Sequence, residues 1–225
     1  MTSWVGVLPS IHQPWTDACL ASMHPAFRAS VLVVDNTKVN RGVFRACNAG
    51  IDRMREVGAD WLVYMSAAVR LGDPGGVDFI DHLDAWRDAC VIEADHVFGW
   101  HLIAFHRRTI DQVGRWDENF DPYGPGDLDY SVRIRKALNL AIDPNHGVWT
   151  KVPIDVADEG MAHGINVAGV RIPPARAEWM RSYFRRKWGR HPDRPTDREY
   201  DHPFNTPSRP LSWWPKAPSG GTCDG

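Results

Sequence analysis

VLVVDNTKVNRGVFRACNAGIDRMREVGADWLVYM, residues 31–65, combines two short apolar runs with one amphipathic segment between them. Val31–Val34 and Trp61–Met65 have the length and the β-branched or aromatic composition of buried strands. Residues 42–57 are predicted to form a helix with one apolar face, made of Val43, Cys47, Ile51 and Met54. A strand, a helix and a second strand in this order predict a parallel, doubly wound sheet.

The same alternation continues on both sides of this stretch. Upstream, Trp4–Leu8 reads as a strand ended by Pro9, and residues 15–23 read as a helix. Downstream, we expect helices at residues 77–86, 109–113 and 174–188, and strands at residues 90–92 and 100–106. The sequence therefore predicts an α/β fold with a doubly wound, mostly parallel sheet and flanking helices. One domain is expected over residues 1–189, and the proline-rich residues 190–225 are expected to form an extended tail packed on it.

Composition narrows the class of protein. The chain has 225 residues, of which 43% are hydrophobic, and this is enough for one domain with a sizeable core. A formal net charge of −2 gives no indication of nucleic-acid binding. The four cysteines are scattered without zinc-ligand spacing, which fits a reducing cytoplasm. We find no signal peptide and no apolar run of about 20 residues that could span a bilayer.

Several polar or small residues follow the predicted strands directly. They are Pro9 and Ser10 after the first strand, Asp35 and Asn36 after the second, and Ser66–Ala68 after the third. In doubly wound sheets, ligands bind beyond the carboxyl ends of the strands. The strand assignment alone therefore predicts a ligand site at this edge of the sheet.

The stretch Val113–Arg135, VGRWDENFDPYGPGDLDYSVRIR, carries the candidate chemistry. Asp127 and Asp129 follow a Gly-Pro-Gly turn and fall in the first turn of a predicted helix. The helix dipole favours ionised carboxylates there, and such a group can serve as a general base. Alternatively, this is an ordinary acidic first turn, in which Asp129 pairs with Arg133 four residues later.

This stretch resembles a motif of the inverting family-2 glycosyltransferases, roughly VG-x-FDE-x-F followed by ED-x-D-x-x-x-R. VLVVDN resembles the family's second strand, and residues 40–51, NRGVFRACNAGI, resemble the segment after it. GMAHG, with His163, resembles a late histidine motif, and residues 182–189, SYFRRKWG, resemble a C-terminal YY-x-x-KWG run. The ordered matches cover most of residues 4–189.

The resemblance implies a GT-A fold and transfer of a single sugar with inversion, because the Q-x-x-R-W motif of processive members is absent. It makes Asp127 the general base, and Asp129 matches the later acidic position of the motif. The donor is implied to be a nucleotide-diphosphate sugar, with a UDP-sugar favoured over a GDP- or dTDP-sugar. The acceptor is a glycan, a protein or a lipid-linked sugar, in the cytoplasm of a bacterial or phage-infected cell. The expected donor-binding residues are Pro9, Ser10, Asp35, Asn40, Arg41, Asn48, Ser66, Ala68, Arg70, Trp100 and His163.

The chain departs from the family at two places. Gly126 replaces the glutamate before the base, and Ser66–Ala68 replaces the metal-binding Asp-rich triplet. Since hard cations prefer carboxylate oxygens, we expect no metal at the usual position and give the cation's role to Arg70. The open alternative is Mn²⁺ or Mg²⁺ at a non-standard site that includes His163.

Two other classes are compatible with the same pattern. One is a catalytically inactive protein that binds nucleotide sugars or glycans, because the metal triplet and the glutamate are missing. The other is a nucleotidyltransferase, which is disfavoured because LPSIHQPW after the first strand has neither a glycine-rich phosphate loop nor a lysine.

Overall fold

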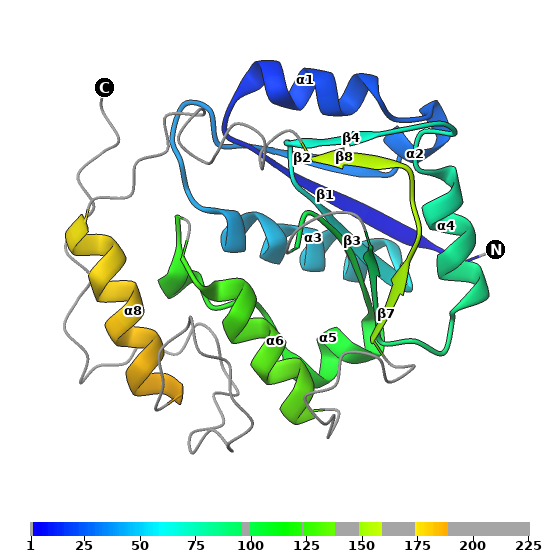
Figure 1. Ribbon diagram of the computed structural model, residues 1–225. Coiled ribbons are helices and arrows are strands. Elements are labelled where there is room, and N and C mark those ends of the chain that lie inside the picture. Colours follow the sequence, from blue (N-terminus) through cyan, green and yellow to red (C-terminus); the bar gives the residue numbers. More distant parts are fainter. Residues whose placement is uncertain (1, 96–99, 123, 138–148, 159–173, 189–225) are drawn as a thin grey trace.

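The computed structural model describes residues 2–95, 100–122, 124–137, 149–158 and 174–188. A six-stranded sheet with strand order β2-β1-β3-β6-β5-β7 forms the centre of the molecule (Figure 1). Its strands are β1 (Trp4–Ser10), β2 (Val31–Asp35), β3 (Trp61–Met65), β5 (Val91–Ala94), β6 (Leu102–His106) and β7 (Trp149–Val152). Strand β6 is antiparallel to β3 and β5, whereas the other neighbouring strands are parallel.

Helices cover both faces of this sheet (Figure 1). They are α1 (Gln13–Ala21), α2 (Pro25–Arg28), α3 (Val43–Val57), α4 (Val77–Ala85), α5 (Arg107–Val113), α6 (Gly126–Ala137) and α8 (Pro174–Trp188), with a 3₁₀ turn η1 (Glu118–Phe120). Strands β4 (Val69–Leu71) and β8 (Val156–Asp158) pair antiparallel in a second, small sheet.

The central sheet separates two hydrophobic cores. Leu62, Ile103 and Phe105 face a core shared with α3, α5, α6 and α8. Their strand neighbours Trp61 and Ala104 face the other core, which is shared with α1, α2 and α4. This alternation follows from the period of two along a strand, and burial on both faces explains why β1 and β3 are continuously apolar. The prediction that Val31–Val34 is a buried strand is wrong, because β2 lies at the edge of the sheet and Val33 is 38% exposed.

The start of α3 is fixed by a residue from a distant part of the chain. The carboxylate of Asp121 accepts hydrogen bonds from the backbone N–H groups of Phe44 (2.8 Å) and Arg45 (3.1 Å). These are two of the N–H groups that have no partner within the helix. Gly42 has φ +108°, and a Cβ at this position would lie 1.9 Å from the Asp121 carboxyl carbon. The segment before α6 is therefore held against the start of α3.

The structure confirms the α/β class, with a mostly parallel sheet and flanking helices. The helix predicted at residues 174–188 has the bounds of α8, and the strand predicted at residues 61–65 has those of β3. The sequence did not indicate β4, β7, β8 or α2, nor the reversed direction of β6. None of the helices in the described ranges is long and apolar enough to cross a membrane. The predicted tail, residues 190–225, lies outside the described residues.

Candidate functional site

The ends of β1 and β2 bring two of the predicted residues together. Ser10 lies beside Asp35 in the parallel register, and the Ser10 carbonyl accepts a hydrogen bond from the Asn36 backbone N–H (2.7 Å). The Ser10 hydroxyl is buried against that of Thr16, at 2.7 Å, whereas Asp35 is exposed. Asp35 therefore presents a carboxylate to solvent at this edge of the sheet.

Asp35 also closes a local turn. Its Oδ1 accepts hydrogen bonds from the Thr37 backbone N–H (2.8 Å) and hydroxyl (2.6 Å). The Thr37 hydroxyl, followed by the Thr37 N–H, lowers the pKa of Asp35 below its ordinary value. The carboxylate is thus ionised at neutral pH, with Oδ2 on an exposed side chain as a candidate acceptor for a nucleotide base.

The loop between β2 and α3 is organised by two asparagines. Buried Asn36 accepts from the Arg41 backbone N–H (3.3 Å) and donates to the Gly42 carbonyl (3.3 Å). The Asn40 side chain accepts from the Gly42 N–H (3.0 Å), while the Arg41 side chain is exposed. Asn40 therefore shapes the loop, and Arg41 is, with Lys38, one of two exposed cations that the loop offers.

The third strand leads to the place where the resemblance expects a metal triplet. The backbone N–H of Ser66 donates to the His101 carbonyl (2.8 Å), and the Ser66 hydroxyl accepts from the Ala68 N–H (3.2 Å). Ala67 and Ala68 are buried, with exposed fractions of 6% and 4%. This turn contributes one half-buried hydroxyl and no carboxylate.

Arg70 lies just beyond this turn, in β4. Its Nη1 donates to the carbonyls of Ala67 and Val69, both at 2.8 Å, so the guanidinium folds back over the Ser66–Ala68 turn. The side chain is half-buried, and its positive charge acts on the nearby Cys19 thiol. The structure therefore places a cation next to the turn that lacks the metal-binding carboxylates.

Asp127 lies in the first turn of α6, as predicted, and its side chain is half-buried. Its Oδ1 accepts from the Leu128 backbone N–H (2.8 Å). The preceding residue packs directly on α3, since a Cβ on Gly126 would lie 2.4 Å from the Phe44 ring. A glutamate at position 126 would need Phe44 to move, which accounts for the glycine in this chain.

Burial raises the pKa of Asp127 above the ordinary value of an aspartate. The Leu128 N–H and the charge of His101 act in the opposite direction, and the carboxylate of Asp129 adds to the increase. A carboxylate with a raised pKa is a stronger base than an exposed one. His101 was not among the residues predicted for the site. Its signal was its position directly before β6, where the structure places it beside Ser66.

Asp129 has a different environment from Asp127. It is fully buried, and its oxygens accept from Trp188 Nε1 (2.8 Å), Lys187 Nζ (2.7 Å) and Arg133 Nε (3.1 Å). This is the ion pair with Arg133 that the spacing allowed, extended by two residues of α8. A carboxylate enclosed in this way cannot reach a substrate hydroxyl, so Asp127 remains the candidate base.

Two other predicted residues make structural contacts. Buried Asn48 bonds the backbone N–H and carbonyl of Trp116 (2.8 and 3.1 Å) and the side chain of Glu118 (2.9 Å). Half-buried Trp100 packs its ring on Phe105 and Tyr130, with centroids 5.2 and 5.9 Å apart. Trp100 thus links the start of β6 to α6.

Of the two remaining predicted residues, the structure describes one, Pro9. Pro9 lies buried within β1 beside Val34 of β2. His163, the predicted contact for a metal or diphosphate, lies outside the described residues.

Taken by position, the candidate site lies at the edge of the sheet where α3 and α6 begin, on the left of Figure 1. Asn36 joins the end of β2 to the loop before α3, and Phe44 packs at the start of α6. Ser66 and His101 join the end of β3 to the region that acts on Asp127. We use "strand-end site" for Asp35, Arg41, Ser66, Arg70, His101 and Asp127.

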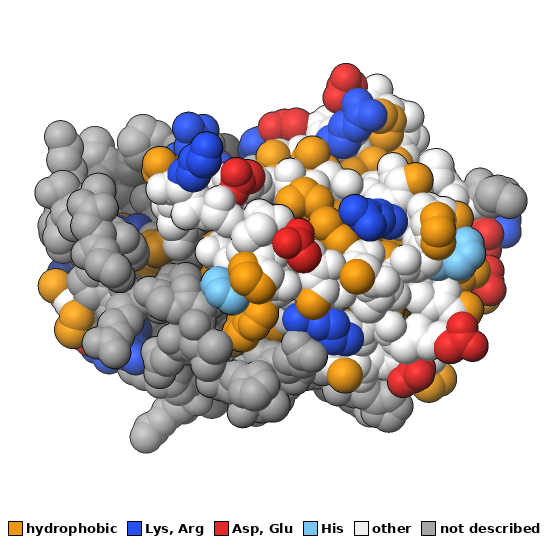
Figure 2. Space-filling model, turned by 90° about the horizontal axis from the view of Figure 1, so that it is seen from above, with side chains coloured by type: hydrophobic (Ala, Val, Ile, Leu, Met, Phe, Trp, Pro, Cys, Tyr) orange, Lys and Arg blue, Asp and Glu red, His pale blue; other side chains and the backbone are white. Residues whose placement is uncertain are grey.

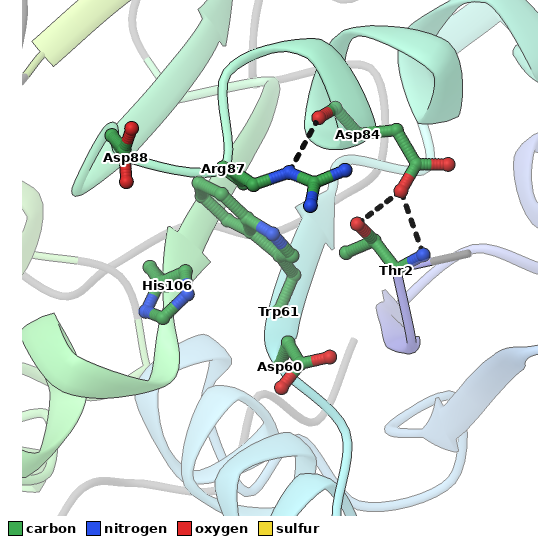
Figure 3. A pocket seen from close by; sticks show the side chains of 7 residues that line it. All are labelled: Thr2, Asp60, Trp61, Asp84, Arg87, Asp88 and His106. Atoms are coloured by element: carbon green, nitrogen blue, oxygen red, sulfur yellow. Dashed lines mark hydrogen bonds between the residues drawn. The ribbon is translucent and has the colours of Figure 1, made fainter.

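A separate hollow of ≈ 340 Å³ opens at the opposite edge of the sheet (Figure 3). It is lined by Thr2, Asp60, Trp61, Asp84, Arg87, Asp88 and His106. Two of its carboxylates already accept hydrogen bonds, Asp84 from Thr2 and Asp60 from Ser3. None of the residues predicted from the sequence lines it.

The face seen in Figure 2 mixes acidic, basic and apolar side chains and carries no extended patch of one charge among the residues described there. An extended basic surface is the usual footprint of a nucleic-acid-binding protein. This face therefore shows no such footprint.

Comparisons with known proteins give structural matches only. No family model matches the chain, and no curated protein sequence matches it. A mannosyltransferase from Pyrobaculum calidifontis, solved with GDP-mannose and Mn²⁺, matches 59% of this chain with a TM-score of 0.44 and 12% identity. The match covers 51% of the mannosyltransferase chain. A197 from STIV matches 50% of this chain and 68% of its own, with a TM-score of 0.33 and 12% identity. Both TM-scores lie below 0.5, and we draw no conclusion about activity from them.

Proposed function

We propose that this chain is a GT-A-type glycosyltransferase that moves a single sugar from a nucleotide-diphosphate sugar to an acceptor hydroxyl. The observation that carries the proposal is the position of Asp127. A half-buried carboxylate with a raised pKa begins helix α6, and an exposed carboxylate ends β2 at the same edge of the sheet. This is the arrangement expected from the resemblance of Val113–Arg135 and VLVVDN to family-2 enzymes.

In the proposed reaction, the nucleotide base lies over Asp35 and the diphosphate crosses the Ser66–Ala68 turn. Asp127 takes the proton of the acceptor hydroxyl, whose oxygen bonds to the anomeric carbon while the bond to the diphosphate breaks. Attack occurs from the face opposite the diphosphate, so the configuration inverts. Negative charge develops on the leaving diphosphate, and fixed positive groups stabilise it. Arg70 and Arg41 are the arginines that the strand-end site offers for this.

The residues at the end of β3 do not fit a divalent cation. Ser66 offers one hydroxyl, and Ala67 and Ala68 offer no ligand atom in their side chains, whereas Mg²⁺ and Mn²⁺ prefer carboxylate oxygens. Among the described residues, no group of three or more His, Cys, Asp or Glu could hold a metal ion. The proposed reaction therefore has no step that depends on a metal.

Donor binding and transfer are expected to survive EDTA, while Arg70→Ala lowers transfer more than chelation does. The physical reason is that the Arg70 guanidinium is held by two carbonyls beside the proposed diphosphate position. Initial rates with and without EDTA, for the wild type and Arg70→Ala, test this. Arg53→Ala removes an exposed arginine of α3 that pairs with Glu56 and serves as the control. Loss of activity in EDTA with recovery in Mn²⁺ would contradict the prediction and point to a metal held by other groups, such as His163.

A thermal-shift panel of UDP-, GDP- and dTDP-sugars tests the proposed donor class. A ligand that binds only the folded state stabilises it by RT ln(1 + [L]/Kd), which is about 2.7 kcal/mol at a hundredfold excess over Kd. Stabilisation by at least one nucleotide sugar is expected. If no member of the panel raises the melting temperature, the proposal fails.

Asp35→Ala is expected to weaken binding of the nucleotide by about 1–3 kcal/mol while changing turnover at saturating donor much less. Its exposed carboxylate would accept a hydrogen bond from the base, and the reacting groups lie elsewhere in the strand-end site. Calorimetric titration with UDP and GDP measures the affinity. Asp81→Ala, which removes an exposed carboxylate of α4, is the matched control. Equal nucleotide affinities for Asp35→Ala and the wild type would contradict this prediction and show that Asp35 only stabilises the local turn at Thr37.

The second candidate is a catalytically inactive protein that binds nucleotide sugars or glycans. The Ser66–Ala68 turn favours it, since this turn lacks the carboxylates expected from the family. Binding of a nucleotide sugar without hydrolysis or transfer would support this candidate over the enzyme.

A further inference from the structure

Four charged side chains meet in the interior beside the start of α6. Asp117 precedes η1, Asp129 and Arg133 lie on α6, and Lys187 lies near the end of α8. Lys187 Nζ contacts Asp117 Oδ2 (2.6 Å) and Asp129 Oδ1 (2.7 Å), and Arg133 Nε contacts Asp129 Oδ2 (3.1 Å). We call these four residues the buried charge cluster.

The buried charge cluster is almost closed to water. Asp129 is fully buried, and the exposed fractions of Asp117, Arg133 and Lys187 are 1%, 5% and 5%. Two carboxylates and two cations balance in formal charge. Removing one partner of a buried ion pair leaves an uncompensated charge in a medium of low dielectric constant, and this is strongly unfavourable. The cluster therefore requires α8 to stay docked on α6.

The same helix also holds the segment that leads into the strand-end site. Arg176, in the first turn of α8, donates to the carbonyls of Asn119 (2.9 Å) and Asp121 (2.6 Å). Met180 packs so closely on Gly124 that a Cβ there would lie 2.6 Å from its sulfur atom. Helix α8 therefore braces both the chain before α6 and, through Lys187, the first turns of α6.

Electrostatics connect the buried charge cluster to Asp127. Asp129 lies two residues after Asp127, and its negative charge disfavours ionisation of Asp127. Arg133 and Lys187 contact the Asp129 oxygens directly, and positive charges at such distances oppose the field of the carboxylate. Two titratable groups act on Asp127, His101 before β6 and Asp129 on α6. Behind Asp129 lie Arg133 on α6, Lys187 on α8 and, in contact with Lys187, Asp117 before η1.

We propose that Lys187 is a positioning residue for the strand-end site: it neutralises Asp129 and holds the start of α6, so that Asp127 stays in its ionised, proton-accepting form. Lys187 itself is buried and does not touch the substrate. This proposal rests on the proposed function only because it takes Asp127 to be the base. The ionisation of Asp127 can be measured without a substrate.

The test follows the titration of the Asp127 carboxyl by NMR in protein labelled with ¹³C-aspartate, the resonance being identified by its loss in Asp127→Asn. In Lys187→Met the midpoint is expected to rise by about half a pH unit or more, because the negative charge of Asp129 is less compensated. Arg185→Met is the matched control. It removes a positive charge from the exposed side of α8, where solvent screens it, and should leave the midpoint unchanged.

Two further variants separate charge from packing. Lys187→Gln keeps N–H donors toward the two carboxylates but lacks the positive charge. It is expected to fold and to raise the midpoint, and it replaces Lys187→Met in the test if that variant does not fold. Lys187→Met combined with Asp129→Asn removes the repelling carboxylate and should return the midpoint to the wild-type value or below it. A folded Lys187→Met or Lys187→Gln protein with the wild-type midpoint would overturn the proposal. Absence of sugar transfer with every donor would overturn the proposed function and leave this titration interpretable.

Discussion

Asp127→Asn is expected to lower the rate of sugar transfer by about 10²–10⁴-fold while leaving donor binding nearly unchanged. The substitution removes the ability to accept a proton and changes little volume. Oδ1 of Asp127 accepts a hydrogen bond from the Leu128 backbone N–H, and the amide oxygen of the variant can accept the same hydrogen bond. Initial transfer rates at saturating donor, together with donor affinity by calorimetry, separate the two effects.

The matched comparison for Asp127→Asn is Asp129→Asn. It removes the other candidate carboxylate, which is fully buried among Arg133, Lys187 and Trp188. In a folded protein it should reduce transfer less than Asp127→Asn does. A lower activity for Asp129→Asn at equal folded fraction would instead assign the base role to Asp129.

Asp129→Ala is expected to reduce the free energy of unfolding by about 3–5 kcal/mol, because it leaves Arg133 and Lys187 without their shared buried carboxylate. Urea unfolding followed by circular dichroism measures this change. For a domain of ordinary stability, about 5–15 kcal/mol, such a loss is a large part of the total.

An exposed aspartate–arginine pair provides the control for this prediction. Asp111 contacts Arg55 at 3.2 Å, and both side chains are about half exposed. Because exposed ion pairs contribute about 0–1 kcal/mol, Asp111→Ala should change the free energy of unfolding by less than about 1 kcal/mol. Similar small losses for Asp129→Ala and Asp111→Ala would show that the buried charge cluster contributes little to the fold.

The sequence predicted the parts of the fold whose signal is local. The strand Trp61–Met65 was found because burial on two faces of a sheet gives a continuous apolar run, and the helix before it because burial on one face gives a periodic apolar pattern. The strand Val31–Val34 was found from its β-branched composition, although β2 is a half-exposed edge strand. The periodic apolar pattern also located α8. The reversed direction of β6 carries no such local signal, since it depends on which neighbour the strand pairs with. Strands β4 and β8 are three residues long each and depend on pairing with one another.

For the site, the sequence singled out Asp35, Asp127 and Asp129 as candidates but could not separate Asp127 from Asp129. Both are aspartates in the first turn of one helix. They differ because Lys187 and Trp188 of α8 enclose Asp129, and Trp188 lies 59 residues from Asp129 in the sequence. The donor-binding role of Asn48 stays a prediction, and its partners in the structure, Trp116 and Glu118, adjoin it only in the folded chain. His101 was missed for the same reason, because its proximity to Ser66 arises from the pairing of β3 with β6.

Release of nucleoside diphosphate from a panel of UDP-, GDP- and dTDP-sugars by the purified wild-type chain tests the central claim most directly. The reaction is run in EDTA, with water or a simple glycan as acceptor. We predict release from at least one donor, at a rate that falls at least about a hundredfold in Asp127→Asn. Binding of donors with no release from any of them, or equal release by the wild type and Asp127→Asn, would contradict the assignment of a glycosyltransferase that uses Asp127 as its base.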